Sequence, residues 1–283
     1  MSDKMKNFIV RTITGVLFVI IMVSGIAFRA EAMILLFALI TGLTIWEYTG
    51  LVNEIENVSV NRSISTTAGV YLFLAFAGYC ADITPPVIFI PYLLTLVYLF
   101  ISELYTKNPN PIHDWAYTML GQMYIALPLS MFNVLAFRYS QTDGFVHYNG
   151  LLALSIFIFL WCNDTGAYCS GSLFGKHKLF PRISPGKTWE GSIGGAVIVL
   201  IVAAIISWYD QSLSIFEWLG LGLVVVFFGT WGDLVESLFK RTLGIKDSGN
   251  IMPGHGGMLD RFDSSLMAIP ASVVYIYTLS LCN

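Results

Sequence analysis

Charged side chains gather in one stretch of this 283-residue chain, residues 237–263, which reads SLFKRTLGIKDSGNIMPGHGGMLDRFD. Seven of them stand in a chain that is otherwise mostly apolar: Lys240, Arg241, Lys246, Arg261, Asp247, Asp260 and Asp263. Cations suit phosphate oxygens, and carboxylates suit a divalent metal ion that bridges phosphates. Glycines at 249, 254, 256 and 257, with Pro253, predict a loop whose backbone can approach a ligand closely. The stretch therefore indicates a site for phosphates and a metal ion.

The residues just before and at the start of this stretch belong to a predicted helix with polar side chains on one face. Asp233, Ser237 and Lys240 fall at positions i, i+4 and i+7, so they share that face. This row offers a metal ligand, a hydroxyl group and a cation for phosphate. Glu236 could instead pair with Lys240 four residues on, which is the structural alternative.

Two acids, Asp260 and Asp263, stand three residues apart at the start of the last predicted helix. The helix dipole favours acids at a helix start, so one of them could serve only as a cap. Because Asp233 lies at another helix end, we interpret the three acids as a divalent-ion site. Magnesium fits this set, since it commonly takes one or two carboxylates together with substrate phosphates. His255 has no partner His or Cys at ligand spacing, which argues against zinc, and it could bind a phosphate or hold the loop.

Two further polar segments interrupt the apolar chain. Asn163 and Asp164 stand near the end of an apolar predicted helix, where an ionisable group is a functional candidate, although Asp164 could simply touch interfacial water. Ser184, Lys187 and Thr188 form a glycine-bearing turn that leads into the next predicted helix, whose N-terminus attracts phosphate. The cytoplasmic bias of basic residues would explain Lys187 but not the adjacent Ser184. We therefore predict a nucleotide-phosphate site at this turn.

The composition defines the class of protein that must position these residues. Hydrophobic residues make up 56% of the chain and charged residues 12%, about half the charged fraction of an ordinary soluble domain. The mean hydropathy is +0.71. The chain is therefore expected to be an integral membrane protein. Nucleic acid is not expected as a partner, because no basic domain stands apart from the apolar runs.

The apolar runs predict an all-α fold of about nine transmembrane helices, since a spanning helix needs about 20 mainly apolar residues. These runs cover 9–28, 32–51, 66–81, 85–105, 116–137, 149–170, 191–208, 213–232 and 264–281. Eight or ten spans would also fit if residues 66–105 were organised differently. We expect two parts, an N-terminal part of about five spans (1–148) and a C-terminal catalytic part (149–283). The catalytic part contains two charged loops, 171–190 and 232–263.

The basic residues predict the orientation of these spans. With a cytoplasmic N-terminus and nine spans, thirteen of the fifteen Lys and Arg residues lie on the cytoplasmic side, and only Arg29 and Arg138 lie outside. Basic residues accumulate on the cytoplasmic side of membrane proteins. We therefore expect a C-terminus outside, and both charged loops at the cytoplasmic face of an inner (cytoplasmic) membrane.

The segment from Ser237 to Asp263 resembles the signature of the phosphatidate cytidylyltransferase, or CDP-diacylglycerol synthase, family. It has a Ser-x-x-Lys-Arg start, then Lys-Asp, His-Gly-Gly and Asp-Arg-x-Asp, with no departure from the pattern. A match of about 27 positions is far more specific than a lone glycine motif. Residues 163–168 and 184–191 also resemble segments of the family. The resemblance covers roughly residues 150–270, and the first half matches only as a multi-span region.

The resemblance implies that CTP and phosphatidate react to give CDP-diacylglycerol and pyrophosphate. It further implies dependence on Mg2+, an all-helical fold in the lipid bilayer and a homodimer, and the family has been associated with K+ as a second cation. Asp233 and Asp260 would hold the metal, and Asp263 would hold it or the groups around it. Lys240 joins these three acids as a catalytic residue. The predicted substrate-binding residues are Lys187, Ser184, Ser237, Arg241, Lys246, His255, Arg261, Asp164 and Asn163.

Two other functions are weighed against this one. A CTP-dependent polyprenol kinase or an archaeol-type cytidylyltransferase would keep CTP and the metal but bind a different lipid. A secondary transporter could also have nine spans, but transporters place their coupling residues near the bilayer midplane, often in inverted repeats. Here the ionisable residues gather at one interface and no repeat is visible, so an enzyme is favoured.

Overall fold

The structure, a computed structural model, describes residues 3–140, 143–252, 254 and 256–282, and the chain forms two compact units. The first unit comprises Met1–Gly150 and Asp247–Arg261, and the second comprises Leu151–Lys246 and Phe262–Asn283. The first stretch of the first unit thus ends at Gly150, and the expected division into 1–148 and 149–283 stays a prediction. The segment 247–261, which carries most of the signature loop, belongs to the first unit.

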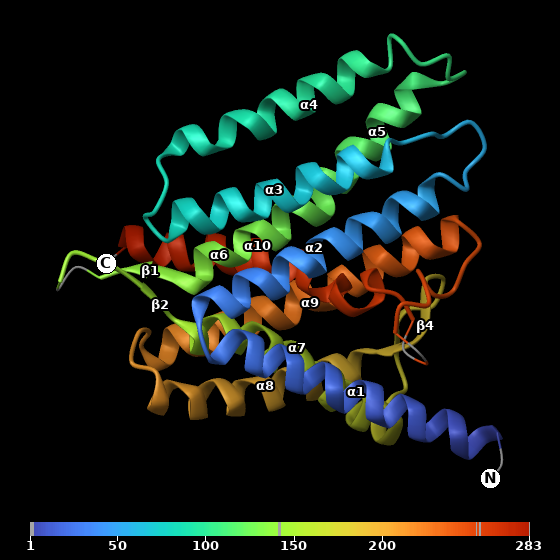
Figure 1. Ribbon diagram of the computed structural model, residues 1–283. Helices are drawn as coiled ribbons and strands as arrows, with labels where there is room; N and C mark the ends of the chain where they lie inside the picture. The colour runs from blue at the N-terminus through green and yellow to red at the C-terminus, as the bar shows by residue number, and fades with distance from the viewer. Residues whose placement is uncertain (1–2, 141–142, 253, 255, 283) are drawn as a thin grey trace. The chain divides into compact units, whose positions relative to one another are not determined.

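The first unit is built of helices and one short hairpin (Figure 1). Its elements are α1 (Asp3–Ala27), α2 (Ala30–Val52), α3 (Arg62–Cys80), η1 (Pro86–Phe89), α4 (Ile90–Ser102), α5 (Pro111–Gly121), η2 (Gln122–Ala126), α6 (Leu127–Ala136), β1 (Phe137–Tyr139) and β2 (Val146–Tyr148). Helix α3 packs between α2 and α6, and β1 pairs antiparallel with β2.

The second unit holds the remaining elements. They are α7 (Gly150–Phe174), β3 (Lys178–Phe180), β4 (Ser184–Thr188), α8 (Trp189–Tyr209), α9 (Ile215–Thr242) and α10 (Leu259–Cys282), whose first three residues belong to the first unit. Strands β3 and β4 form an antiparallel hairpin, and α8 packs along α9. Because a short turn joins α8 to α9, the start of α8 and the end of α9 lie at the same end of this unit.

The expected all-α membrane fold is confirmed. Eight helices of the described chain are long and apolar enough to cross a membrane, namely α1, α2, α3, the continuous helix Pro111–Ala136, α7, α8, α9 and α10. The fourth predicted span, 85–105, is a shorter apolar helix, Pro86–Ser102. Strands are confined, within the described residues, to the two short hairpins. The chain is therefore a multi-pass membrane protein.

The continuous helix Pro111–Ala136 contains a π-helical turn over Gln122–Ala126. Pro128 follows this turn, and a proline inside a helix lacks the N–H group and clashes with the carbonyl group four residues before it. A π turn opens the helix locally and accommodates that clash. The Gln122 side chain, which is buried, donates a hydrogen bond to Ser65 O (2.9 Å) on α3. The distortion thus keeps this span in one piece against its neighbour.

Glycines let the helices of the second unit approach closely. A Cβ atom on Gly195 of α8 would lie 2.8 Å from the backbone oxygen of Asn163 on α7. A Cβ atom on Gly232 of α9 would lie 2.7 Å from the backbone oxygen of Asp263 on α10. Small residues at such contacts bring helix backbones together in membranes, where apolar surfaces alone give little driving force. The two contacts set the spacing of α7, α8, α9 and α10 where their polar residues lie.

Gly232→Ala should therefore destabilise the second unit. The added methyl group would meet the backbone of α10, which cannot move aside as a side chain can, and overpacking of this kind costs about 1–3 kcal/mol. The matched control is Gly222→Ala on the same helix, where the nearest atom, 3.1 Å away, belongs to the Val199 side chain. Thermal unfolding in detergent should show a lower midpoint for Gly232→Ala than for Gly222→Ala. Equal midpoints would contradict this account of the α9 and α10 contact.

Candidate active site

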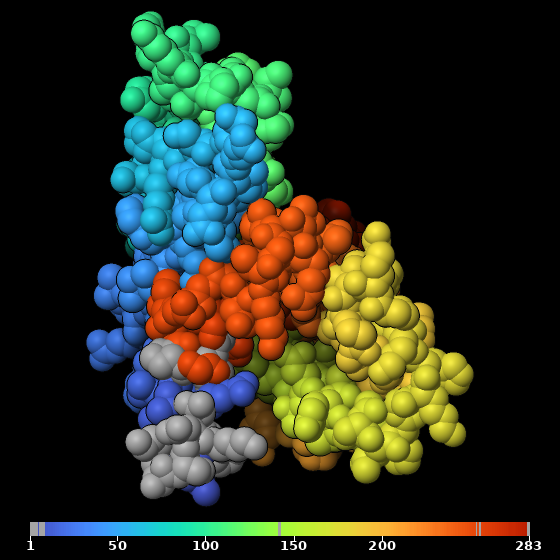
Figure 2. Space-filling view, turned by 90° about the vertical axis from the view of Figure 1, so that its right-hand side faces the viewer, coloured from blue at the N-terminus to red at the C-terminus, as the bar shows by residue number. Residues whose placement is uncertain are grey.

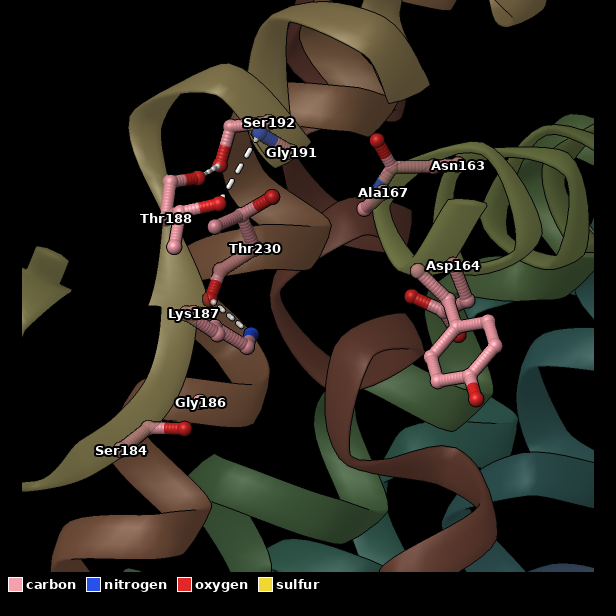
Figure 3. A pocket seen from close by; sticks show the side chains of 11 residues that line it. Asn163, Asp164, Ala167, Ser184, Gly186, Lys187, Thr188, Gly191, Ser192 and Thr230 are labelled. Atoms are coloured by element: carbon pink, nitrogen blue, oxygen red, sulfur yellow. Dashed lines mark hydrogen bonds between the residues drawn. The ribbon is translucent and has the colours of Figure 1, made fainter. Parts of the chain in front are cut away.

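A polar pocket of about 390 Å³ lies in the second unit, among α7, β4, α8 and α9 (Figure 3). Four of the predicted substrate-binding residues line it: Asn163, Asp164, Ser184 and Lys187. Thr188, Ser192 and Thr230 add hydroxyl groups to its wall. The predicted turn before α8 and the polar end of α7 therefore contribute to one cavity. Asn163 is buried and Asp164 is exposed.

The hairpin that carries Ser184 and Lys187 is held at its base by the first turn of α8. Thr188 caps this helix, because its Oγ1 accepts a hydrogen bond from the backbone N–H of Gly191 (3.1 Å). The Glu190 carboxylate accepts hydrogen bonds from the backbone N–H groups of Lys176 and His177 (3.2 Å each). Figure 2 shows the hairpin region, coloured yellow, at the surface. Lys187 thus stands on a fixed hairpin beside a helix N-terminus, as a phosphate site requires.

Lys187 connects this hairpin to α9. Its Nζ lies 2.5 Å from Asp233 Oδ2 and 3.4 Å from the backbone oxygen of Thr230 (Figure 3 shows the second contact). The two charged side chains are 25% and 31% exposed, and Lys187 also lines the pocket. Two groups that the sequence analysis assigned separately, the turn before α8 and the row on α9, therefore meet in one site.

Two members of the predicted polar row on α9, Asp233 and Ser237, contact each other, whereas Lys240 pairs with Glu236. Ser237 Oγ donates a hydrogen bond to Asp233 Oδ1 (3.1 Å), so the two side chains share one face of the helix. Lys240 Nζ lies 2.6 Å from Glu236 Oε2, which is the structural alternative for Lys240. Glu236 is fully buried and the Lys240 side chain is 12% exposed. Removing one partner of such a pair leaves a buried charge without compensation, which is strongly destabilising.

Three carboxylates form an acidic cluster beside this row. Oxygen atoms of Asp233, Glu236 and Asp263 lie within 4.8 Å of one another. Oxygens on opposite sides of one Mg2+ ion are about 4 Å apart, since each Mg–O bond is about 2.1 Å, so the cluster fits such an ion with modest movement. Asp233 forms an ion pair with Lys187 and Glu236 forms one with Lys240, and Asp263 brings a third carboxylate to the cluster. The cluster therefore suits a divalent metal ion.

Glu236 is the member of this cluster that the sequence analysis did not include as a metal ligand. It stands three residues after Asp233, a spacing that places two side chains on one helix face. That signal was present, but the i+4 spacing to Lys240 gave Glu236 an alternative partner. The structure has both arrangements together, because Glu236 contacts Lys240 and also lies in the acidic cluster.

Asp260, the third predicted metal ligand, lies in the first unit and holds the signature loop. Its Oδ2 accepts hydrogen bonds from the backbone N–H groups of Ser248 (2.9 Å) and Gly257 (2.8 Å). Gly254 and Gly256 have positive φ angles of 76° and 85°, a conformation that favours glycine. The capping alternative thus describes the contacts of Asp260, and its role at a metal stays a prediction.

The remaining predicted residues have simpler surroundings. Arg241 Nη1 donates a hydrogen bond to the backbone oxygen of Ile245 (3.2 Å) just after α9 ends. Lys246 and Arg261 are exposed. His255 lies outside the residues that the structure describes. A role at phosphates stays a prediction for each of these residues.

Comparison with known proteins places these features in a family. Residues 9–279 match the model of the cytidylyltransferase family, so the similarity extends well beyond residues 150–270. The chain is 36% identical over 264 residues to phosphatidate cytidylyltransferase of Staphylococcus aureus (strain COL), covering 92% of this chain and 96% of the relative. The phosphatidate cytidylyltransferases of Staphylococcus haemolyticus and Staphylococcus epidermidis are 35% and 34% identical, with the same coverage.

The acidic cluster predicts a measurable affinity for divalent ions. Asp233→Asn and Asp263→Asn should each weaken binding of Mn2+, used as a spectroscopic probe, by about tenfold or more, because each removes one anionic ligand. Electron paramagnetic resonance of the free ion measures this. Asp210→Asn, at the other end of α8, is the control and should bind Mn2+ as the unchanged protein does. Unaltered binding in both cluster variants would contradict the assignment.

Proposed function

The chain belongs to the cytidylyltransferase family, and on that premise we propose that it is a phosphatidate cytidylyltransferase. The reaction would join CTP and phosphatidate and yield CDP-diacylglycerol and pyrophosphate. One observation carries the proposal, namely the ion pair between Lys187, which lines the polar pocket, and Asp233, which belongs to the acidic cluster, at the ends of membrane-spanning helices. Such a pocket pairs groups for phosphates with groups for a metal where a lipid can arrive from the bilayer.

The chemistry requires few groups from the protein. A phosphate oxygen of phosphatidate attacks the α-phosphorus of CTP, and the bond from that phosphorus to the bridging oxygen of the β-phosphate breaks. The electron pair of that bond leaves with pyrophosphate. The attacking oxygen is already anionic, so no nucleophilic side chain is needed. The main obstacle is repulsion between two polyanions, and preorganised cations lower it.

We assign the metal-binding and phosphate-binding roles to residues of the second unit. We assign Asp233 and Asp263 to the metal, with Glu236 as the buried member of the cluster. Lys187 would bind a phosphate of CTP, and Ser184 would assist from the same strand. A bound Mg2+ ion would neutralise charge on the triphosphate and on the departing pyrophosphate.

Other assignments come from the resemblance to the family signature. They give Asp260 to the metal, Ser237 and Lys240 to the reacting groups, and Arg241, Lys246, His255 and Arg261 to phosphates. Asn163 and Asp164 would contact the nucleotide from α7, which their place in the pocket supports. A homodimer, K+ as a second cation and an active site at the cytoplasmic face of the inner membrane also belong to the proposal. The distribution of Lys and Arg supports that orientation.

The lipid would enter through an apolar groove of about 330 Å³ that adjoins the pocket. Ser192 and Thr230 line both cavities, so the groove continues from the polar site. Its other walls are apolar or aromatic: Leu179, Trp189, Leu223, Val226, Phe227 and Trp231. We propose that the glycerol backbone and the first part of the acyl chains lie here, with the phosphate group in the pocket.

The proposal predicts pyrophosphate release that depends on phosphatidate. Protein purified in detergent should release pyrophosphate from CTP with Mg2+ and phosphatidate, and a CDP-lipid should appear. Lys187→Ala should lower kcat/KM by about 100-fold, because it removes a charge-assisted contact to phosphate worth about 2–3 kcal/mol. Lys178→Ala, at an exposed position on β3 of the same hairpin, should stay within about threefold of the unchanged protein.

Three outcomes of that assay are informative. Pyrophosphate release with an archaeol-type lipid, or phosphorylation of a polyprenol with formation of CDP, in the absence of activity with phosphatidate would replace phosphatidate as the substrate. Absence of any reaction with every lipid tested, in protein that unfolds cooperatively, would contradict the proposed enzymatic activity and favour a secondary transporter. Equal activity of the Lys187 and Lys178 variants would contradict a role for Lys187 in binding phosphate.

The groove predicts a selective effect on the lipid substrate. Leu223→Trp, which fills the groove, should raise the KM for phosphatidate about tenfold and leave the KM for CTP within about twofold, since a lost apolar contact is worth about 1–3 kcal/mol. Val197→Trp on α8 is the control, because Val197 is similarly exposed but does not line the groove. A parallel rise of both KM values in the Leu223 variant would argue against a lipid site there.

A further inference from the structure

Glu47, near the end of α2, is a buried carboxylate that the proposed reaction does not use. It is 7% exposed, and it accepts three hydrogen bonds from the segment 247–261. The donors are Ser248 Oγ (2.5 Å), the backbone N–H of Met258 (2.8 Å) and the backbone N–H of Leu259 (3.0 Å). All four residues belong to the first unit, although about 200 positions separate Glu47 from its partners.

Two of these donors stand at the start of α10, which begins at Leu259. The first N–H groups of a helix have no acceptor within the helix and carry its positive dipole end. Glu47 therefore caps α10 from another helix. An ionised carboxylate is well suited to this, because it only accepts hydrogen bonds and its bonds are charge-assisted.

Ser248 links this cap to the signature acid Asp260. The Ser248 hydroxyl donates to Glu47 and accepts a hydrogen bond from the backbone N–H of Asp260 (3.3 Å). The backbone N–H of Ser248 in turn donates to the Asp260 carboxylate (2.9 Å). A movement of the Glu47 carboxylate would therefore shift Ser248 and, through it, the Asp260 side chain.

The glycines of the loop fit around the same carboxylate. A Cβ atom on Gly249 would lie 2.5 Å from Glu47 Oε2, which is closer than real Cβ contacts allow. A Cβ atom on Gly257 would stand still closer to Glu47 Oε1. Gly257, the last glycine of the His-Gly-Gly motif, is therefore required where the backbone passes over Glu47.

We propose that Glu47 is a positioning residue for the cytidylyltransferase reaction. It holds Ser248, Met258 and the first turn of α10, and so fixes the direction of the Asp260 carboxylate. This inference rests on the proposed function, in which the signature acids serve the metal and the phosphates. α10 also carries Asp263 one turn after Asp260, so a defined helix start sets the position of both acids along the helix.

Glu47→Gln tests the inference with little change of shape. The amide group of glutamine presents a donor to N–H groups that themselves donate, so at least one of the three hydrogen bonds is lost. We expect kcat to fall about tenfold or more, since small misplacements of reacting groups cost up to about 100-fold, while the KM for phosphatidate stays within about twofold. Glu47→Asp should recover part of the lost kcat.

Asp114→Asn is the matched control. Asp114 is also buried in the first unit, and its carboxylate accepts hydrogen bonds from the backbone N–H of Ser59 (2.6 Å) and from Asn108 Nδ2 (2.9 Å). It holds a different loop, so its variant should lose thermal stability but keep kcat within about twofold. Loss of kcat in both variants in proportion to their unfolding midpoints would overturn a positioning role for Glu47.

A second measurement does not depend on activity. Hydrogen exchange at the amides of Met258 and Leu259 should accelerate in Glu47→Gln and stay unchanged in Asp114→Asn. Ser248→Ala, which keeps both amide contacts, should show the kcat loss without this acceleration. Unchanged exchange in Glu47→Gln would overturn the inference. Absence of cytidylyl transfer in the unchanged protein would instead reject the proposed function, and the exchange result would still decide whether Glu47 holds the loop.

Discussion

A carboxylate among apolar helices persists only where donors or cations surround it, and this constraint shapes both units. Asp233 faces Lys187 and Ser237, and Glu236 faces Lys240. In the first unit Glu47 faces a hydroxyl group and two backbone amides instead. Each of these three carboxylates thus has a donor or a cation beside it, and glycines at the contacts of α7 with α8 and of α9 with α10 allow the helices of the second unit to approach closely.

The partners of these carboxylates differ in how freely they can move away. The Lys187 side chain in the second unit is long and partly exposed. It can therefore turn toward a phosphate while a metal ion takes its place beside Asp233. Backbone amides in the first unit belong to a loop and a helix start, and they cannot leave without unfolding that segment. The second unit therefore offers groups for ligands, and the first unit offers a frame for the signature loop.

The sequence predicts those features whose signal is local. Runs of about 20 apolar residues predicted the spanning helices, and the i, i+4 spacing placed Asp233 beside Ser237. The fourth run produced a shorter helix because a Pro-rich turn begins it and a turn ends it near Ser102. Glu47 was not predicted, because its hydrogen-bond partners lie about 200 positions away and no residue near it in the sequence indicates which residues they are. Its one local signal was an ionisable residue inside an apolar run, which is costly without partners.

The ion pair between Lys187 and Asp233 has a consequence for how ligands arrive. An anion that recruits Lys187 frees Asp233 for a cation, and a cation on Asp233 frees Lys187 for an anion. By thermodynamic linkage, each ligand then raises the affinity for the other by the same factor. Under the proposed function, the resting pair would thus favour binding of the metal and the nucleotide together over binding of either one alone.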